Sequence, residues 1–115
     1  MKNQETILQN QIKRYLIINN IAVVFRANVG KIKIDDKRYF STGLQAGFSD
    51  LFGYRLKDGK IFFMEVKTKK GKLTENQVNF LEEQKKNGAI AGVVKSINDA
   101  LELLEEKKKE GVIYN

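Results

Sequence analysis

The first clear pattern in the chain is a helical repeat of apolar residues near its start. Four residues fall on one face at helical spacing: Leu8, Ile12, Tyr15 and Leu16. The residues between them are mainly amides and cations, which a helix of this kind turns toward water. The pattern predicts a helix over residues 3–19 whose apolar face packs on the rest of the fold.

After this helix, short runs rich in Val, Ile and Phe alternate with turns. They predict strands over residues 21–28, 32–34, 38–40, 50–56, 60–67 and 89–95. Helical patterns cover residues 74–87, ended by Gly88, and residues 96–109. The order α-β-β-β-β-β-α-β-α predicts an α/β fold with a mixed central β-sheet flanked by helices. Strands 60–67 and 89–95, joined through a helix, are expected to form a right-handed parallel crossover.

The strand over residues 60–67 carries apolar residues on both of its faces. Ile61 and Phe63 point to one side of the sheet, and the residues that alternate with them, such as Phe62, point to the other. A strand that is apolar on both faces is expected at the centre of a sheet, covered on both sides. Glu65 and Lys67 continue the face of Ile61 and Phe63 at the carboxyl end of this strand.

A carboxylate and an ammonium group are unusual at the end of such a strand. Burying them costs several kcal/mol per ion unless other groups compensate their charges. A metal ion against Glu65 would be such a compensation, because it favours the ionised carboxylate. The alternative is an ordinary surface ion pair where the strand emerges into solvent. The Glu-X-Lys pattern by itself does not decide between the two.

Asp50 adds a second carboxylate to this end of the sheet. Counting outward from a turn at residues 57–59 places Asp50 opposite Val66 or Lys67 in an antiparallel hairpin. Two carboxylates and a lysine then converge at one edge, because Glu65 lies on the same strand end. The alternative for Asp50 is a turn or capping role after the preceding glycine loop.

The composition restricts the chemistry of such a site. The chain has no Cys and no His, which excludes disulfides, thiolate metal sites and histidine-based general acid–base catalysis. Oxygen ligands alone suit Mg²⁺ or Mn²⁺ better than zinc.

Two further polar residues each admit two interpretations. Glu5 lies three residues before Leu8, so it continues the apolar stripe and is placed to reach the sheet edge as a metal or water ligand. It equally fits the preference of acidic residues for a first helical turn. Gln77 completes a capping box with Thr74, and it also lies at a helix start that would face the edge of Lys67.

Charge suggests a polyanionic partner. The formal net charge is +7, and residues 1–80 carry 15 Lys or Arg against 7 Asp or Glu, which is +8. Such an excess is typical of nucleic-acid binding, although a merely basic protein has it too. The candidates for phosphate contacts, each equally interpretable as a solvated surface charge, are Lys31, Lys33, Lys37, Arg38, Lys69, Lys70 and Lys72.

The spacing of these motifs resembles the VRR-NUC domain of the PD-(D/E)XK nuclease superfamily. The resemblance rests on five pieces: Gly47-Phe48-Ser49-Asp50, Glu65-Val66-Lys67, Gly71-Lys72-Leu73-Thr74, Gln77 with Phe80, and Gly88. The family has a proline before the motif aspartate, and Ser49 stands there in this chain. That proline shapes the backbone and takes no part in the chemistry.

The resemblance implies a restriction-endonuclease-like core and a site that hydrolyses phosphodiester bonds. By resemblance, Asp50 and Glu65 are ligands of Mg²⁺ or Mn²⁺, together with the carbonyl of Val66. Lys67 is the catalytic lysine, Glu5 is the acidic residue of the first helix, and Gln77 is the glutamine of the helix after the motif. Stand-alone members from phage and bacteria are similar to this chain and are proposed to be homodimers that cleave branched DNA such as four-way (Holliday) junctions.

We therefore expect one nuclease domain over residues 1–115, with a core from about residue 3 to residue 105 and a charged C-terminal end. No apolar run is long enough for a membrane span and no signal-peptide pattern is present, so a cytoplasmic location in a bacterium or phage-infected cell is expected. Two other interpretations stay open. One is a nucleic-acid-binding module with a decayed site; the other is a DNA-repair or packaging protein that recruits a partner through its acidic last helix.

Overall fold

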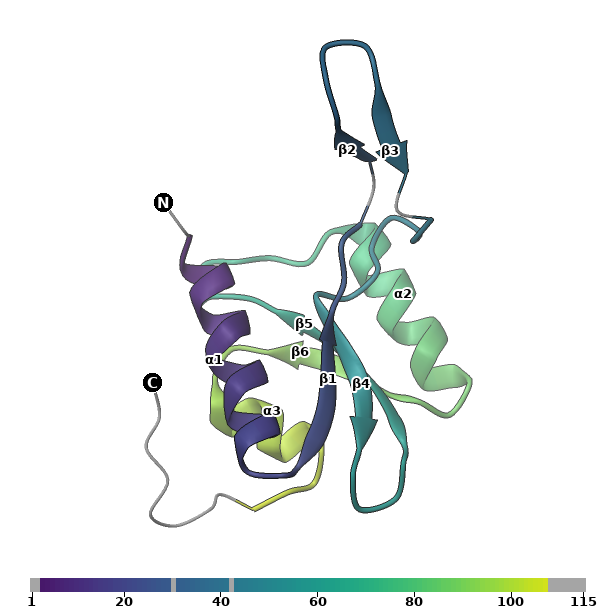
Figure 1. The fold of residues 1–115 in the computed structure, drawn as a ribbon. Coiled ribbons are helices and arrows are strands. Elements are labelled where there is room, and N and C mark those ends of the chain that lie inside the picture. The colour runs from purple at the N-terminus through teal and green to yellow at the C-terminus, as the bar shows by residue number, and fades with distance from the viewer. Residues whose placement is uncertain (1–2, 30, 42, 108–115) are drawn as a thin grey trace.

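The computed structural model describes residues 3–29, 31–41 and 43–107 (Figure 1). Its elements are α1 (Gln4–Ile18), β1 (Ala22–Arg26), β2 (Lys31–Lys33), β3 (Tyr39–Ser41), β4 (Leu51–Arg55), β5 (Ile61–Val66), α2 (Glu75–Lys86), β6 (Ile90–Val94) and α3 (Ile97–Leu103). The predicted order of elements is confirmed, and most bounds agree within two residues.

The main sheet has the strand order β1-β4-β5-β6. β1 pairs with β4 and β4 with β5 in antiparallel fashion, whereas β5 and β6 run parallel. This confirms the predicted mixed α/β sheet and the central position of β5, in which every residue from Phe62 to Val66 is buried. β2 and β3 form a separate two-stranded hairpin that projects beyond the body of the molecule (Figure 1).

Helices cover both faces of this sheet. The larger core lies between the sheet and helices α1 and α3, where Ile12, Phe62 and Leu101 pack together. The smaller core lies under α2, where Phe63 packs against Phe80 and Leu81. Full burial of one such side chain contributes roughly 1.5–3 kcal/mol to folding, so the two cores hold the strand that carries Glu65 from both sides.

The register of the β4–β5 hairpin differs from the prediction. Leu51 pairs with Met64, which brings Asp50 next to Glu65 rather than opposite Val66 or Lys67. The reason lies at the other end of the hairpin, where the N–H of Arg55 donates to the Lys60 carbonyl (3.0 Å) and the N–H of Gly59 donates to the Arg55 carbonyl (2.7 Å), so that the turn covers residues 56–59. The turn is therefore longer than the three residues assumed from the sequence.

The last helix is shorter than predicted: it was expected over residues 96–109 and ends at Leu103. Leu104 is buried, and its carbonyl accepts a hydrogen bond from Nη1 of Arg55 (2.9 Å). The chain then turns at Glu105, whose φ of 57° is incompatible with a continued α-helix. Tertiary contacts thus end the helix although its sequence favours a longer one. Residues 108 and 109 of the predicted helix lie outside the described residues.

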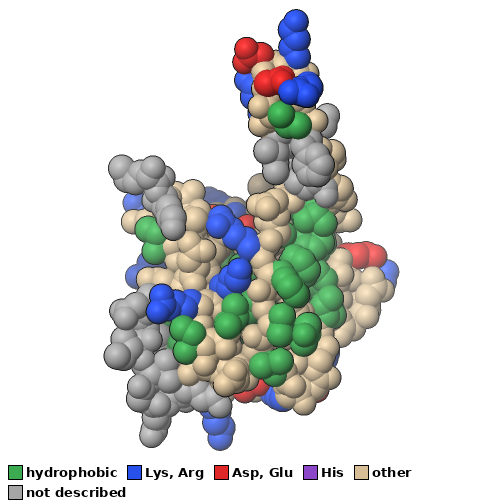
Figure 2. Space-filling view, in the orientation of Figure 1, with side chains coloured by type: hydrophobic (Ala, Val, Ile, Leu, Met, Phe, Trp, Pro, Cys, Tyr) green, Lys and Arg blue, Asp and Glu red, His purple; other side chains and the backbone are tan. Residues whose placement is uncertain are grey.

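One part of the sheet is left open on the side of α2. Three apolar side chains there are nearly half exposed: Phe25 (47%), Tyr54 (42%) and Ile61 (47%). Together with Phe52 we call them the apolar sheet face, and Figure 2 shows hydrophobic side chains gathered over β1 and β4 below the projecting hairpin. No helix within the described ranges is both long and apolar enough to cross a membrane.

Candidate active site

The candidate site begins with two carboxylates that the strands hold in place. The backbone N–H of Asp50 donates to Oε1 of Glu65 (3.2 Å), and the backbone N–H of Val66 donates to Oδ2 of Asp50 (2.9 Å). Each carboxylate therefore accepts a hydrogen bond from the backbone of the facing strand. Because both strands are part of the packed sheet, the two acidic side chains are fixed relative to each other before any ligand arrives.

Glu65 is a deeply buried carboxylate. Only 1% of the residue is exposed, and its Oε2 has no hydrogen-bond partner. Burial and then the negative charge of Asp50 raise the pKa of Glu65 to about 8, against a smaller opposing effect of the Lys67 ammonium. A buried oxygen without a partner costs roughly 1–3 kcal/mol, so this position favours a cation at Oε2.

The donor set fits a hard divalent cation. Two acidic side chains contribute oxygens at one edge, and no thiolate or imidazole is present anywhere in the chain. No third acidic side chain of the described residues joins Asp50 and Glu65 in a group able to hold a metal. Two carboxylates suit Mg²⁺ or Mn²⁺, because these ions keep several water ligands at sites of this kind.

Lys67 and Glu5 meet at the same edge. The backbone N–H of Lys67 donates to the Val94 carbonyl (3.1 Å), which fixes the chain where it leaves β5. A Cβ placed on Gly71 would lie 3.1 Å from Cδ of Lys67 and 3.3 Å from Oε2 of Glu5. The first helix thus brings its carboxylate next to the stem of the lysine, and Gly71 leaves room for both.

A model of the VRR-NUC domain matches residues 4–98, a stretch that includes every residue of the site described so far. The chain belongs to the VRR-NUC domain family. This is a family of PD-(D/E)XK-like nuclease domains, so the protein is a nuclease with DNA as its substrate. Domains of this kind generally use divalent metal ions. No curated protein sequence matches the chain.

In this VRR-NUC domain, the residue before the aspartate is Ser49 where the family resemblance predicts proline. Ser49 is buried, and its hydroxyl donates to the Leu51 carbonyl (3.0 Å). A hydrogen bond therefore constrains the backbone before Asp50, in place of a proline ring. Gly47 is also required here, because its φ is +89° and a Cβ would lie 2.3 Å from the carbonyl oxygen of Asn76.

The capping box at the start of α2 is confirmed. The backbone N–H of Thr74 donates to Oε1 of Gln77 (2.9 Å), and that of Gln77 donates to Oγ1 of Thr74 (3.2 Å). The side-chain oxygen of Gln77 is therefore engaged in the helix cap. A catalytic role for this residue stays a prediction, and it would use the amide nitrogen.

The predicted phosphate-binding cations fall into two groups. One is on the β2–β3 hairpin, where Nε of Arg38 pairs with Asp35 (2.7 Å), Nζ of Lys33 lies 3.9 Å from Asp36, and Lys37 is exposed. The side chain of Lys31 lies outside the described residues. The other group follows β5, where Lys69, Lys70 and Lys72 are all exposed.

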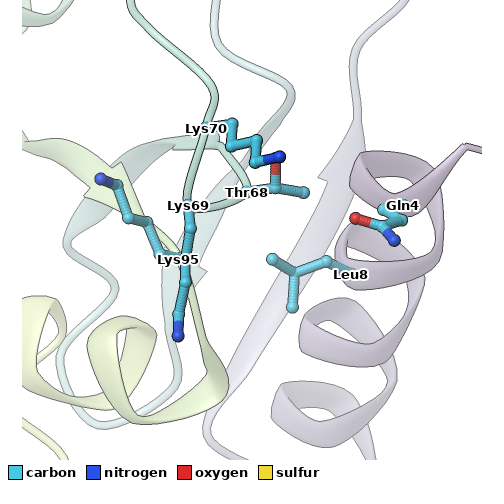
Figure 3. Close-up of a pocket in the computed structure, with 6 residues that line it drawn as sticks. All are labelled: Gln4, Leu8, Thr68, Lys69, Lys70 and Lys95. Carbon is cyan, nitrogen blue, oxygen red and sulfur yellow. The ribbon is translucent and has the colours of Figure 1, made fainter.

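Sequence reasoning missed Lys95. It lines one surface depression together with Lys69 and Lys70 (Figure 3). The signal was present, because residues that directly follow two parallel strands lie at the same edge of a sheet. The predicted crossover from β5 to β6 therefore implied that Lys95 lies near Lys67.

Proposed function

We propose that this VRR-NUC protein is a metal-dependent endonuclease that hydrolyses phosphodiester bonds of DNA at the edge formed by Asp50, Glu65 and Lys67. The observation that carries the proposal is the unpartnered Oε2 of Glu65, buried beside a second carboxylate. A purely structural ion pair would place an opposite charge against Glu65. The nearest charge is instead the carboxylate of Asp50, which has the same sign and makes the arrangement unfavourable.

The residues have separate roles in this proposal. Asp50, Glu65 and the carbonyl of Val66 hold Mg²⁺ or Mn²⁺, which supplies a Lewis acid for the scissile phosphate and for a water. The Lys67 ammonium stabilises the negative charge that develops on the phosphoryl oxygens. Glu5 orients Lys67 or a further water, since its carboxylate lies beside the lysine stem at Gly71. The amide of Gln77 is the remaining candidate for a contact at this edge.

A cleavage assay with added Mg²⁺ or Mn²⁺ tests this assignment. We expect Glu65→Ala and Lys67→Ala to lower the cleavage rate at least about 100-fold, as removal of transition-state stabilisation does, while DNA binding is retained. Glu82→Gln, an exposed acid on α2, is the control and should cut like wild type. Wild-type rates for both site variants would disprove the assignment, and binding without any cleavage by wild type would favour the decayed-site alternative.

We further propose that the substrate is branched DNA, such as a four-way junction, and that the active form is a homodimer. A junction with two-fold symmetry needs two cuts, and a symmetric pair of domains supplies two sites. The apolar sheet face supports a dimer, because exposed apolar patches of this kind favour association. Action on intracellular DNA also makes the cytoplasm of a bacterium or phage-infected cell the proposed location.

A further inference from the structure

We propose that Lys95, with Lys69 and Lys70, forms a second phosphate-binding site that holds a DNA phosphate beside the scissile one. This inference rests on the proposed function, because it assigns the path of the DNA strand next to the catalytic edge. Lys95 lies outside the proposed catalytic group, so a variant at Lys95 tests the phosphate site separately from the proposed nuclease activity.

The position of Lys95 follows from the parallel pairing of β5 and β6. Val66 pairs with Val94, so both chains leave the sheet at the same level. The hydrogen bond from the Lys67 N–H to the Val94 carbonyl (3.1 Å) extends this pairing by one residue. Lys95 therefore starts beside Lys67, and the catalytic lysine and the second site share one strand end.

The backbone of Lys95 is fixed although its side chain is exposed. Its N–H donates to Oδ2 of Asp99 (2.9 Å), and the N–H of Asp99 donates to Oγ of Ser96 (3.0 Å). This cap ties the start of α3 to the end of β6. The ammonium group consequently extends from a rigid position, which lowers the entropy lost when it binds an anion.

An open depression of about 480 Å³ lies between this strand end and the first helix. Its lining consists of Gln4, Leu8, Thr68, Lys69, Lys70 and Lys95 (Figure 3). In Figure 3, Lys69 lies in the turn after β5 and Lys95 directly follows β6, Lys70 lies next to Thr68, and Gln4 and Leu8 face them from α1. The lining thus combines three cations with two neutral polar side chains and one apolar contact.

The charge of this depression is unbalanced. No acidic residue lines it, and none of its three lysines forms an ion pair with an acid in the described part of the chain. Lysines that line one depression without counter-charges make it positive, and a positive depression attracts a phosphate. Because Lys69 and Lys70 follow Lys67 by two and three residues, the nearest phosphates are those that flank the cut on the same DNA.

The first test measures DNA affinity against salt concentration without cleavage, in EDTA. Each phosphate contact contributes roughly 0.9 to the slope of log K against log salt, so Lys95→Ala should lower the slope by about one. Lys86→Ala, an exposed lysine at the end of α2, makes the same charge change elsewhere and should leave the slope unchanged. Equal slopes for Lys95→Ala and Lys86→Ala would overturn the inference.

The second test locates the phosphate. Single neutral methylphosphonates are placed along a short DNA substrate, and the binding loss at each position is measured for wild type and Lys95→Ala. At one position, we expect the methylphosphonate to weaken binding by wild type but not by Lys95→Ala. Such non-additivity indicates that Lys95 contacts the phosphate at that position directly. The same losses in both proteins at every position would overturn the inference.

Substrates with and without a terminal phosphate distinguish an internal phosphate from a strand end as the group that is held. Loss of the coupling when only the terminal phosphate is removed would assign the site to a strand end. Both tests use binding alone, so they stand even if wild type cleaves no DNA. A changed slope in a protein without cleavage activity would reject the proposed function and keep the phosphate site.

Discussion

Glu65 combines three properties that ordinary surface acids do not have together. It is buried, one of its oxygens has no partner, and its closest ionisable neighbour is another acid. The sequence placed Glu65 at the end of a central strand, but it did not decide between a metal ligand and a surface ion pair. Burial decides against the surface ion pair, because the pair interpretation requires that the strand emerge into solvent at Glu65.

The pH dependence of stability follows from this burial. In the metal-free protein the pKa of Glu65 is about 8, above the ordinary value of 4.5 that applies to the unfolded chain. Between these values the folded state binds one more proton than the unfolded state, so the free energy of unfolding falls as pH rises. Urea unfolding in EDTA should show a decrease on the order of a few kcal/mol from pH 4.5 to pH 8.

Glu65→Gln is the matched control for this effect, because the amide does not titrate. The decrease in the free energy of unfolding between pH 4.5 and pH 8 should be smaller in this variant. Mn²⁺ at pH 8 should stabilise wild type but not Glu65→Gln. An identical pH dependence of the two proteins would show that Glu65 does not cause it.

Gly71 gives a second prediction at the scale of one residue. A methyl group there would lie 3.1–3.3 Å from Lys67 and Glu5 side-chain atoms, closer than normal contact. Gly71→Ala should displace Lys67, the proposed catalytic lysine, by a few tenths of an ångström and lower kcat by roughly tenfold, since small misplacements of a catalytic group are costly. DNA affinity and thermal stability should change little, and an unaltered kcat would contradict this account.

At the scale of elements, the sequence predicted well what depends on local patterns. The order of helices and strands, the capping box at Thr74 and the central position of β5 were all correct. The errors arose where the geometry of a turn or a distant contact decides. The bonds that join Arg55 to Lys60 and Gly59 close a four-residue turn and set the β4–β5 register, and α3 ends early where the Leu104 carbonyl accepts a bond from Arg55.

In the candidate site, too, local patterns predicted some positions correctly and did not contain the information for others. Asp50 and Glu65 were placed at one edge by strand alternation and by counting outward from the turn, although the register was wrong by one or two residues. The meeting of Glu5 with Lys67 at Gly71 depends on how α1 packs, which no local pattern contains. Lys95 lies outside the motif strand, and its place at this edge follows only from the parallel pairing of β5 with β6.

The β2–β3 hairpin gives a prediction at this scale. Of the β2 and β3 side chains that the structure describes (Lys33, Tyr39 and Ser41), none belongs to a core cluster. Replacing residues 32–40 by two glycines should therefore leave the unfolding free energy unchanged within about 1 kcal/mol. DNA affinity should fall by roughly tenfold at moderate salt, because cations such as Lys37 are removed. A Lys33→Ala/Lys37→Ala variant tests the charges alone, and unfolding of the hairpin deletion would contradict the prediction.

At the scale of the whole molecule, charge and apolar surface lie in different places. The proposed catalytic edge and the depression around Lys95 lie at the carboxyl ends of β5 and β6, whereas the apolar sheet face lies over β1 and β4. Helix α2 covers Phe63 and leaves Tyr54 open. A second copy could therefore bind the open face while both catalytic edges stay accessible to DNA.

This arrangement predicts that a charge placed in the apolar sheet face separates the dimer without damaging the site. Tyr54→Lys puts an ammonium at the centre of the proposed interface, where desolvating it costs several kcal/mol, so sedimentation should show monomers. Val78→Lys changes a similarly exposed apolar residue on α2 and should leave the oligomeric state of wild type unchanged.

The Tyr54→Lys monomer should still nick duplex DNA, because Asp50, Glu65 and Lys67 belong to one chain. It should lose the paired cuts across a four-way junction, which need two sites on one substrate. Light scattering that finds wild type monomeric at working concentration would reject the dimer, and paired junction cuts by the Tyr54→Lys monomer would reject its role in cleavage.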